Sequence, residues 1–275
     1  MSRNFELLQN IGKDQDYFHP DRVLTEPVPR EASEPLSEKM AAALEAATSP
    51  APPAAALSNE PLQFAMESSQ LTELSKLVQR VFLMPGGEYN HTVVFTASDS
   101  GNGCSWICAR VGELLASQVT GTVCLVDANL QSPTLHEQFG VPNHHGLADA
   151  LRKSGSIRGY VSQLSRRNLA LVSCGSDLRE GRNLVTSDRM RARMLELRSE
   201  FDYVLIDCPA VGESNEAVSL GTIADGVVLV LKANSTRKDR ARSAVAELQT
   251  SKVKILGAVL NQRTFPIPDS IYSKL

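Results

Sequence analysis

The residues with the clearest chemical potential form a glycine-rich stretch at residues 97–106, Ala-Ser-Asp-Ser-Gly-Asn-Gly-Cys-Ser-Trp. The stretch follows an apolar run at residues 92–96 and leads into a segment with helical spacing. In such a turn the backbone N–H groups converge on an anion, and the positive end of the helix dipole stabilises the negative charge. The sequence therefore predicts a phosphate-binding turn. The residues expected to contact the phosphates are Gly101, Asn102, Gly103, Cys104, Ser105 and Trp106.

The end of this turn departs from the usual phosphate-binding pattern. The spacing resembles a Walker A loop, which closes with Gly-Lys-Ser/Thr, whereas this chain has Gly103, Cys104 and Ser105. The Ser105 hydroxyl is still a candidate Mg²⁺ ligand, but a thiol cannot supply the positive charge of a lysine. Loss of such a charge-assisted contact costs roughly 1.5–3 kcal/mol of binding free energy, and more in phosphoryl transfer. Two interpretations of Cys104 stay open: a reactive thiol with a pKa lowered by the helix N-terminus, or an inert remnant.

Three further polar residues each end an apolar run: Asp127, Asp207 and Asn261. Carboxylates at the carboxyl ends of strands that face a phosphate loop are typical of Mg²⁺-binding and general-base positions. Either aspartate alone could be no more than a strand-end cap, but with the glycine-rich turn they form a specific set. Asp127 and Asp207 are therefore the candidate catalytic residues, and both join Ser105 as candidate Mg²⁺ ligands. Asn261 is a candidate contact for a purine ring.

Apolar runs and helical segments alternate along residues 92–261. The runs are nearly continuous in apolar and β-branched residues, as expected for strands that are buried on both faces. The alternation predicts a doubly wound α/β fold, with a mainly parallel sheet and helices on both faces. The expected strands are residues 92–96, 123–126, 169–173, 203–206, 227–231 and 255–260, and the expected helices are residues 105–117, 147–152, 188–199 and 236–250.

The N-terminal part has a different composition. Residues 1–60 hold 10 acidic and 5 basic residues, a net charge of −5. Residues 31–66 are rich in Ala, Pro, Glu and Ser and hold too few large apolar groups to offset the entropy of ordering, so we predict a disordered linker. Residues 1–30 are compatible with a frayed terminus or a short docking helix. Residues 67–265 are predicted to form the folded domain, followed by a tail at residues 266–275. A helix over about residues 70–83 would pack on the domain or contact another subunit.

The composition of the whole chain disfavours several classes of protein. The 275 residues are 42% hydrophobic and 21% charged, with a formal net charge of −3 and a pI of about 6.0. No bulk basicity indicates nucleic acid, and no apolar run approaches the roughly 20 residues of a membrane span. We therefore expect neither nucleic-acid binding nor direct membrane insertion. Five cysteines without a CxxC pair disfavour a disulfide scaffold or a zinc module and favour a reducing cytoplasm.

The order and spacing of these motifs resemble the bacterial tyrosine autokinases of capsule and exopolysaccharide systems, a branch of the ParA/MinD-type P-loop ATPases. The resemblance covers about residues 70–262. It is most specific at residues 125–136, Leu-Val-Asp-Ala-Asn-Leu-Gln-Ser-Pro-Thr-Leu-His, which are similar to the family's kinase-specific second Walker motif. The resemblance implies a P-loop NTPase fold, Mg²⁺ and catalytic roles for Asp127 and Asp207, an adenine-side role for Asn261, and oligomer contacts by the helix at residues 74–80.

Three parts of the kinase machinery depart from the family pattern. Cys104 stands where the catalytic lysine belongs, and Asn129 stands where the second acid of an Asp-x-Asp motif belongs. Asn129 lacks the charge that would hold Mg²⁺ or attract a tyrosyl proton. The family has a tyrosine-rich tail that is phosphorylated in a neighbouring subunit, whereas this tail has only Tyr272. Ser100 also replaces a usual proline. Three losses in one chain indicate that phosphoryl transfer is no longer the function.

We therefore expect a degenerate kinase-like regulator of exopolysaccharide or capsule polymerisation and export. It would be cytoplasmic, form homo-oligomers and bind the cytoplasmic part of a membrane polysaccharide co-polymerase, reaching the inner membrane only through that partner. ATP or ADP with Mg²⁺ would be at most a weak ligand held by backbone amides. Two alternatives stay open: an active ATP-dependent tyrosine autokinase with Tyr272 as its target, and a ParA/MinD-like ATPase that positions cargo on DNA or membrane.

One charge pattern is not explained by the resemblance. Residues 152–198 hold 11 basic and 4 acidic residues, a net charge of +7, and residues 237–242 form a second basic cluster. These residues could form a solvated face, a surface for an acidic partner such as the chain's own N-terminal part, or a nonspecific DNA surface. His144 and His145 are adjacent in a predicted loop, where solvation is a commoner explanation than a metal.

Overall fold

The computed structural model describes residues 68–84, 90–176 and 184–262, all within one compact unit, Leu57–Leu275. The predicted N-terminal segment, linker and tail (residues 1–30, 31–66 and 266–275) lie outside the described residues, as does Tyr272. The predictions for these segments therefore stay predictions.

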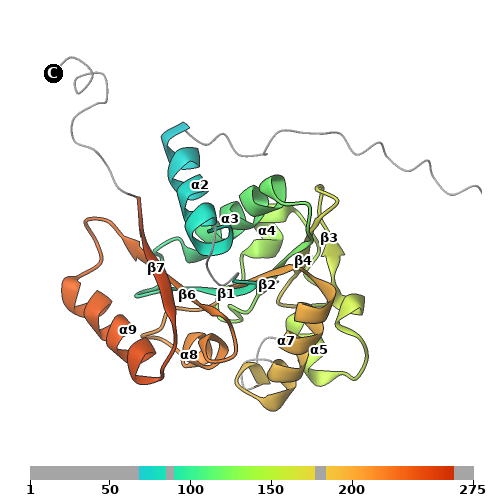
Figure 1. Ribbon diagram of the computed structural model, residues 1–275. Coiled ribbons are helices and arrows are strands. Elements are labelled where there is room, and N and C mark those ends of the chain that lie inside the picture. The colour runs from blue at the N-terminus through green and yellow to red at the C-terminus, as the bar shows by residue number, and fades with distance from the viewer. Residues whose placement is uncertain (1–67, 85–89, 177–183, 263–275) are drawn as a thin grey trace, which may run out of the picture. The chain divides into compact units, whose positions relative to one another are not determined.

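Seven strands in the described residues form one sheet, in the order β3-β4-β2-β5-β1-β6-β7 (Figure 1). Every neighbouring pair is parallel except β3 and β4. The strands are β1 (Thr92–Ala97), β2 (Val123–Asp127), β3 (Ser162–Gln163), β4 (Leu169–Val172), β5 (Tyr203–Asp207), β6 (Gly226–Lys232) and β7 (Ile255–Asn261). β1, β2 and β4 are buried along their whole length, as their continuous apolar sequences predict.

Helices cover both faces of the sheet, which confirms the doubly wound α/β fold (Figure 1). One face carries α2 (Ser68–Phe82), α3 (Cys104–Gln118) and α4 (Leu135–Phe139). The other carries α5 (Leu147–Arg152), α7 (Asp188–Glu200), α8 (Glu216–Gly221) and α9 (Lys238–Thr250). A 3₁₀ turn, η1 (Ile157–Tyr160), connects α5 to β3.

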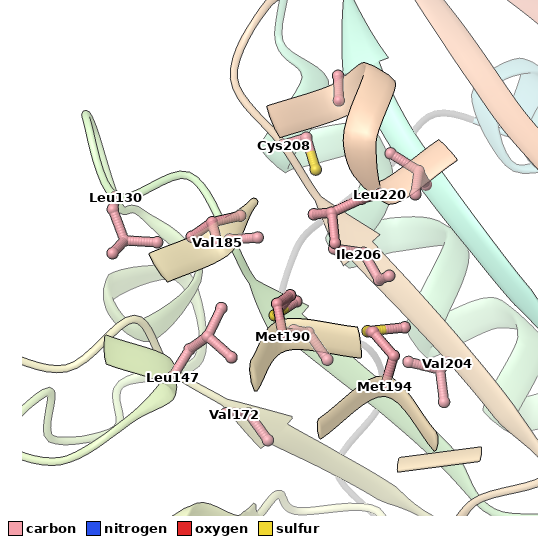
Figure 2. Packing of buried hydrophobic residues seen from close by; sticks show 14 of the residues in the cluster. Leu130, Leu147, Val172, Val185, Met190, Met194, Val204, Ile206, Cys208 and Leu220 are labelled. Carbon is pink, nitrogen blue, oxygen red and sulfur yellow. The ribbon is translucent and has the colours of Figure 1, made fainter. Parts of the chain in front are cut away.

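Each face of the sheet has its own apolar core. Beneath α7, Met190 and Met194 point into a cluster that includes Val204 and Ile206 of β5 (Figure 2). The second cluster joins α2 and α3 to the opposite face of the same strands. The central strands are thereby held from both sides, which fixes the positions of their carboxyl ends.

Helix α2 packs on the domain. Its buried residues are Leu74, Val78, Val81 and Phe82. The Phe82 ring meets Tyr203 edge to face, with 6.1 Å between the ring centroids. The buried Asn90 donates from Nδ2 to the Val81 carbonyl at 2.6 Å and closes the end of the helix. Packing on the domain leaves the outward face of α2 for the predicted subunit contact, which stays a prediction.

The predicted elements differ from the structure mainly where elements are short. α4, α8, η1 and β3 are not among the expected elements, because such short elements give only a weak periodic signal. α5, which is also only six residues long, is an exception and has its expected bounds. The helix expected from residue 236 begins at Lys238. The Thr236 hydroxyl accepts a hydrogen bond from the Lys232 amide at 2.9 Å, and the Thr236 amide donates to the Lys232 carbonyl at 3.0 Å. These bonds close a separate turn ahead of the helix.

Candidate functional site

The carboxyl ends of the central strands bring the predicted site residues together. β5 lies between β1 and β2, and Asp127 and Asp207 are register partners on β2 and β5. The glycine-rich turn follows β1 and leads into α3. Ser105 and Cys104, at the start of α3, lie close enough to Asp207 to affect its pKa.

The glycine-rich turn has the backbone of a phosphate cradle. Gly101 and Gly103 have φ values of 74° and 80°, in the left-handed region that favours glycine. Gly103 is the N-cap of α3, and no side chain caps this helix. The first amides of α3 therefore have no partner within the helix and are donors for an anion.

Asn102 supports the turn from the inside. The residue is only 4% exposed, and its Nδ2 donates to the Ser98 hydroxyl at 3.1 Å and to the Thr236 hydroxyl at 3.4 Å. The side chain thereby ties the turn to the segment that precedes α9. Because these bonds engage the side chain, only the backbone of Asn102 is available to contact a ligand. Trp106, also a predicted contact, packs half-buried against the apolar core on the α2 face.

Asn261 closes over the turn from the end of β7. Its Nδ2 donates to the Asn102 carbonyl at 2.9 Å, and its Oδ1 accepts from the Gln262 amide at 2.8 Å. Nδ2 is so near the turn that a Cβ built on Gly103 would lie 2.4 Å from it. The sequence predicts that Asn261 contacts a purine ring. To donate to such a ring, Nδ2 would have to give up its hydrogen bond to the Asn102 carbonyl.

Asp207 is a fully buried carboxylate. Neither of its oxygens has a hydrogen-bond partner of ordinary geometry within the described residues. Burial raises the pKa of Asp207 to about 7, although the nearby Ser105 hydroxyl and Cys104 thiol lower it. No cation is among the groups that shift this pKa. The carboxyl is therefore partly protonated near neutral pH.

Asp127 is also fully buried but is held by backbone donors. Its Oδ1 accepts from the Asn129 amide at 3.2 Å and its Oδ2 from the Leu135 amide at 3.1 Å. Burial and the negative charge of Asp207 nevertheless raise the pKa of Asp127 well above its usual value. Asn129 uses its side-chain oxygen to accept from the Ser132 amide at 3.2 Å, so this side chain shapes the loop after β2.

Cys104 carries a neutral thiol. Burial raises its pKa well above the usual value, and the nearby Asp207 carboxyl raises it further. The positive end of α3 does not outweigh these effects. The interpretation of Cys104 as a low-pKa thiol is therefore wrong, and the structure favours the inert one.

The side-chain oxygen atoms at the site fit a Mg²⁺ ion better than the side chains of the turn fit nucleotide phosphates. Mg²⁺ takes oxygen ligands, and the Ser105 hydroxyl lies beside the Asp207 carboxylate, which has no partner of ordinary geometry. These two residues would hold the ion, and the ion would offset phosphate charge. The backbone cradle fits a phosphate, but residues 97–106 contain no lysine or arginine to meet it. The turn therefore has the backbone shape of a phosphate site but no basic side chain of its own.

Sequence reasoning missed Arg110, because one arginine in an apolar helix gives no recognisable pattern. Arg110 is 2% exposed, pairs with Glu113 (2.6 Å from Nη1 to Oε2), and lies over the Phe139 ring at 5.8 Å from its centroid. These contacts fix α4 against α3. Because the first residue of α4, Leu135, donates to Asp127, Arg110 acts indirectly on the position of that carboxylate.

Several arginines of the basic stretch, residues 152–198, have structural roles. Arg193 is 8% exposed and donates to the carbonyls of Ala150 at 2.9 Å and Lys153 at 2.8 Å. Arg189 donates to the last carbonyls of α5. Arg158 and Arg198 form ion pairs with Glu200 and Asp225. The charge counted along the chain therefore overstates the positive surface, which favours the compensated face over a DNA surface.

His144 and His145 are both exposed in the loop before α5. Across residues 68–84, 90–176 and 184–262, no group of three or more His, Cys, Asp or Glu residues is arranged to hold a metal ion. The helices of these same residues include none with the length and apolar character needed to cross a membrane.

Comparison with known proteins matches residues 91–249 to the family model described as cellulose biosynthesis protein BcsQ. Tyrosine-protein kinase YwqD of Bacillus subtilis (strain 168) is 32% identical over 170 residues, 62% of this chain and 71% of that protein. Succinoglycan biosynthesis transport protein ExoP of Rhizobium meliloti (strain 1021) is 26% identical over 182 residues, 65% of this chain but only 23% of that longer protein. The solved kinase domain of Escherichia coli tyrosine kinase ETK shares the fold, with a TM-score of 0.63 and 17% identity over 76% of this chain and 88% of that one.

Proposed function

The chain belongs to the bacterial tyrosine-protein kinase family of ParA/MinD-type P-loop ATPases, and we propose that it is a kinase-like regulator that no longer transfers phosphate. It would control exopolysaccharide or capsule polymerisation and export by assembly with other proteins. The processes named for its relatives, cellulose biosynthesis and succinoglycan transport, support this assignment.

The observation that carries the proposal is the contact between Cys104 and Asp207. At the position of the family's lysine, the chain has a neutral thiol beside a carboxyl with a pKa of about 7. Phosphoryl transfer depends on fixed positive charge that offsets the negative charge of the phosphates. Residues 97–106 contain no lysine or arginine that could supply this charge. The backbone cradle is kept and the electrostatic part of the machinery is not.

The loop after β2 supports the same proposal. Asn129 stands at the second acid position of the family motif, and its side chain bonds to Ser132 on the same loop. Asp127 has both oxygens engaged by backbone amides. Asp127 and Asn129 thus hold the loop after β2 in place, which is a role that a scaffold requires.

The proposed partner is the cytoplasmic part of a membrane polysaccharide co-polymerase. ExoP is named as a transport protein, and the matched region is only 23% of its length. We propose that the present chain binds the cytoplasmic part of a protein with such a transport function. Homo-oligomers would form through the outward face of α2, and the protein would be cytoplasmic and peripheral to the inner membrane.

A phosphotransfer assay tests the proposal against an active autokinase. The full chain is incubated with radiolabelled ATP and Mg²⁺ or Mn²⁺, beside an Asp127→Ala variant. We expect no label on the protein with either metal ion. Label on Tyr272 that disappears in Asp127→Ala would contradict the proposal and establish the autokinase.

A further inference from the structure

The two edges of the sheet differ in how they are protected from further pairing. At one edge, β3 is a strand of only two residues. At the other edge, β7 has seven residues, Ile-Leu-Gly-Ala-Val-Leu-Asn, with no charge and no proline (Figure 1). Very short strands, charged side chains and prolines are the usual means by which a sheet edge avoids pairing with another strand. The β3 edge therefore has such protection, and the β7 edge does not.

The hydrogen bonds of β7 show which of its backbone groups face away from the sheet. The Asn261 carbonyl accepts from the Ala233 amide at 2.9 Å, on the β6 side. Because successive residues of a strand direct their N–H and C=O groups to opposite sides, Val259 also faces β6, whereas Ala258 and Leu260 face outward. The register irregularity between β6 and β7 lies at the start of the strand, before this stretch. Within the described residues, no hydrogen bond engages the outward N–H and C=O groups of Ala258 and Leu260.

The side chains at these two positions are apolar and accessible. Leu260 is 54% exposed and Ala258 is also exposed, and residues two apart on a strand lie on the same face of the sheet. An added strand would place its own side chains beside them, and cross-strand apolar pairs stabilise a sheet. The β7 edge thus offers both backbone groups and an apolar surface to one further strand.

The chain itself continues directly from this edge. Residues 263–275 follow β7 and lie outside the described residues. At the junction, Gln262 has a φ of 54°, in the left-handed region that turns use. The last seven residues, 269–275 (Asp-Ser-Ile-Tyr-Ser-Lys-Leu), equal β7 in length and have two strand-forming residues, isoleucine and tyrosine, at their centre. Both prolines of the tail precede this stretch, where a connection between strands tolerates them.

We propose that residues 269–275 fold back and pair with β7 as an antiparallel strand, with residues 262–268 as the connection. An antiparallel return needs only a short connection, whereas a parallel strand would need a crossover of a dozen or more residues, which the tail cannot supply. Because the segment is tethered to the end of β7, its effective concentration at the edge is on the order of millimolar. This tether favours the chain's own tail over a second copy or a separate partner.

The pairing would have a consequence for Tyr272, the one tyrosine of residues 263–275. Its backbone would be held in a strand of its own chain, and the residue would be withheld from a neighbouring subunit. The proposal does not depend on the kinase-like assignment, because it needs only the β7 edge and the sequence that follows it.

Hydrogen exchange of the full chain, followed residue by residue by NMR, tests the pairing. At an unpaired edge, the outward amides of Ala258 and Leu260 exchange freely, while the Val259 amide, which faces β6, is protected. We expect all three amides to be protected in the wild type. The test variant combines Ile271→Pro with Tyr272→Pro, because one of two successive residues must direct its N–H toward β7 whichever register is used. In this variant, exchange at Ala258 and Leu260 should be at least about tenfold faster, with no change at Val259.

A conservative variant at the same two positions is the matched control. Ile271→Val combined with Tyr272→Phe keeps two strand-forming residues and both N–H groups, so exchange at Ala258 and Leu260 should stay within about twofold of the wild type. Free exchange of these two amides in the wild type would overturn the proposal. Protection that survives both prolines would also overturn it: an increase with protein concentration would identify a second copy as the occupant, and no such increase would identify another segment of the chain. Equal acceleration at Val259 would contradict it as well, since the tail would then act on the whole sheet rather than on its edge.

Discussion

At the residue scale, the central feature is Asp207, a buried carboxyl with a neutral thiol, Cys104, beside it. The carboxyl stays buried, as the fold requires at the end of β5, but no cation contributes to its pKa. Cys104 lies beside this carboxyl as a neutral thiol and brings no positive charge. The consequence is a protonation change near neutral pH in the middle of the proposed nucleotide site.

We predict that Asp207→Asn makes stability less dependent on pH. The pKa of Asp207 rises from 3.8 to about 7 on folding, so between these values the folded state holds a proton that the unfolded chain has released. The stabilisation from this proton is complete below the unfolded pKa and is lost as pH rises through the folded pKa. Asparagine cannot ionise, so the advantage of the variant over the wild type should grow by about 1–3 kcal/mol from pH 5 to pH 8. Urea unfolding at both pH values measures it, and a difference that does not change with pH would contradict the raised pKa.

Gly101 and Gly103 offer a matched pair of substitutions. Both have positive φ, but a Cβ on Gly101 meets nothing within 4 Å, whereas one on Gly103 would lie 2.4 Å from Asn261 Nδ2. Gly101→Ala should cost about 1 kcal/mol from backbone strain alone. Gly103→Ala should cost about 1 kcal/mol more, because Asn261 must give up its bond to Asn102. In a Gly103→Ala background, Asn261→Ala should then cost almost nothing, and fully additive losses in urea unfolding would refute this contact.

At the element scale, the strands could be predicted closely and the side-chain partners could not. Continuous apolar runs locate β1, β2, β5 and β6 to within about one residue, because burial on both faces leaves a strong composition signal. The apolar run of β7 locates it equally well, although none of its residues is fully buried. The positions of Asp127 and Asp207 follow, since residues at strand ends meet at one edge of a parallel sheet. The inward Asn102 side chain and its bond to Asn261, 159 positions away, depend on tertiary packing that no local pattern encodes. The raised pKa values depend on the same packing.

In the basic stretch, residues 152–198, the sequence likewise does not reveal which side chains are buried and what they bind. Arg193 and Arg191 are identical in a charge count, yet Arg193 is buried against carbonyl oxygens of another element and Arg191 is exposed. Arg193→Gln should therefore lower the free energy of unfolding by about 2–4 kcal/mol, because buried carbonyls lose their donors. Arg191→Gln should change it by no more than about 0.5 kcal/mol. Equal changes in the free energy of unfolding for the two variants, measured in urea, would mean that Arg193, like Arg191, is only an exposed surface charge.

At the scale of the whole molecule, the P-loop-type fold is complete, and we propose that its set of catalytic charges is not. The two apolar cores hold the sheet from both faces, and α2 is packed into one of them. This framework does not depend on catalytic residues, so it can keep its shape and its surfaces while the chemistry is lost. Assembly with a membrane co-polymerase needs only those surfaces, which is why we favour regulation over catalysis.

The central claim is that Cys104 removes the charge on which nucleotide binding depends while the backbone cradle stays intact. Calorimetric titration with Mg·ADP and Mg·ATP, of the wild type beside Cys104→Lys, tests it directly. We predict no measurable binding by the wild type and clear binding by Cys104→Lys, since an ammonium beside Asp207 restores about 10- to 100-fold in affinity. Micromolar binding by the wild type, or no gain in Cys104→Lys, would contradict the account.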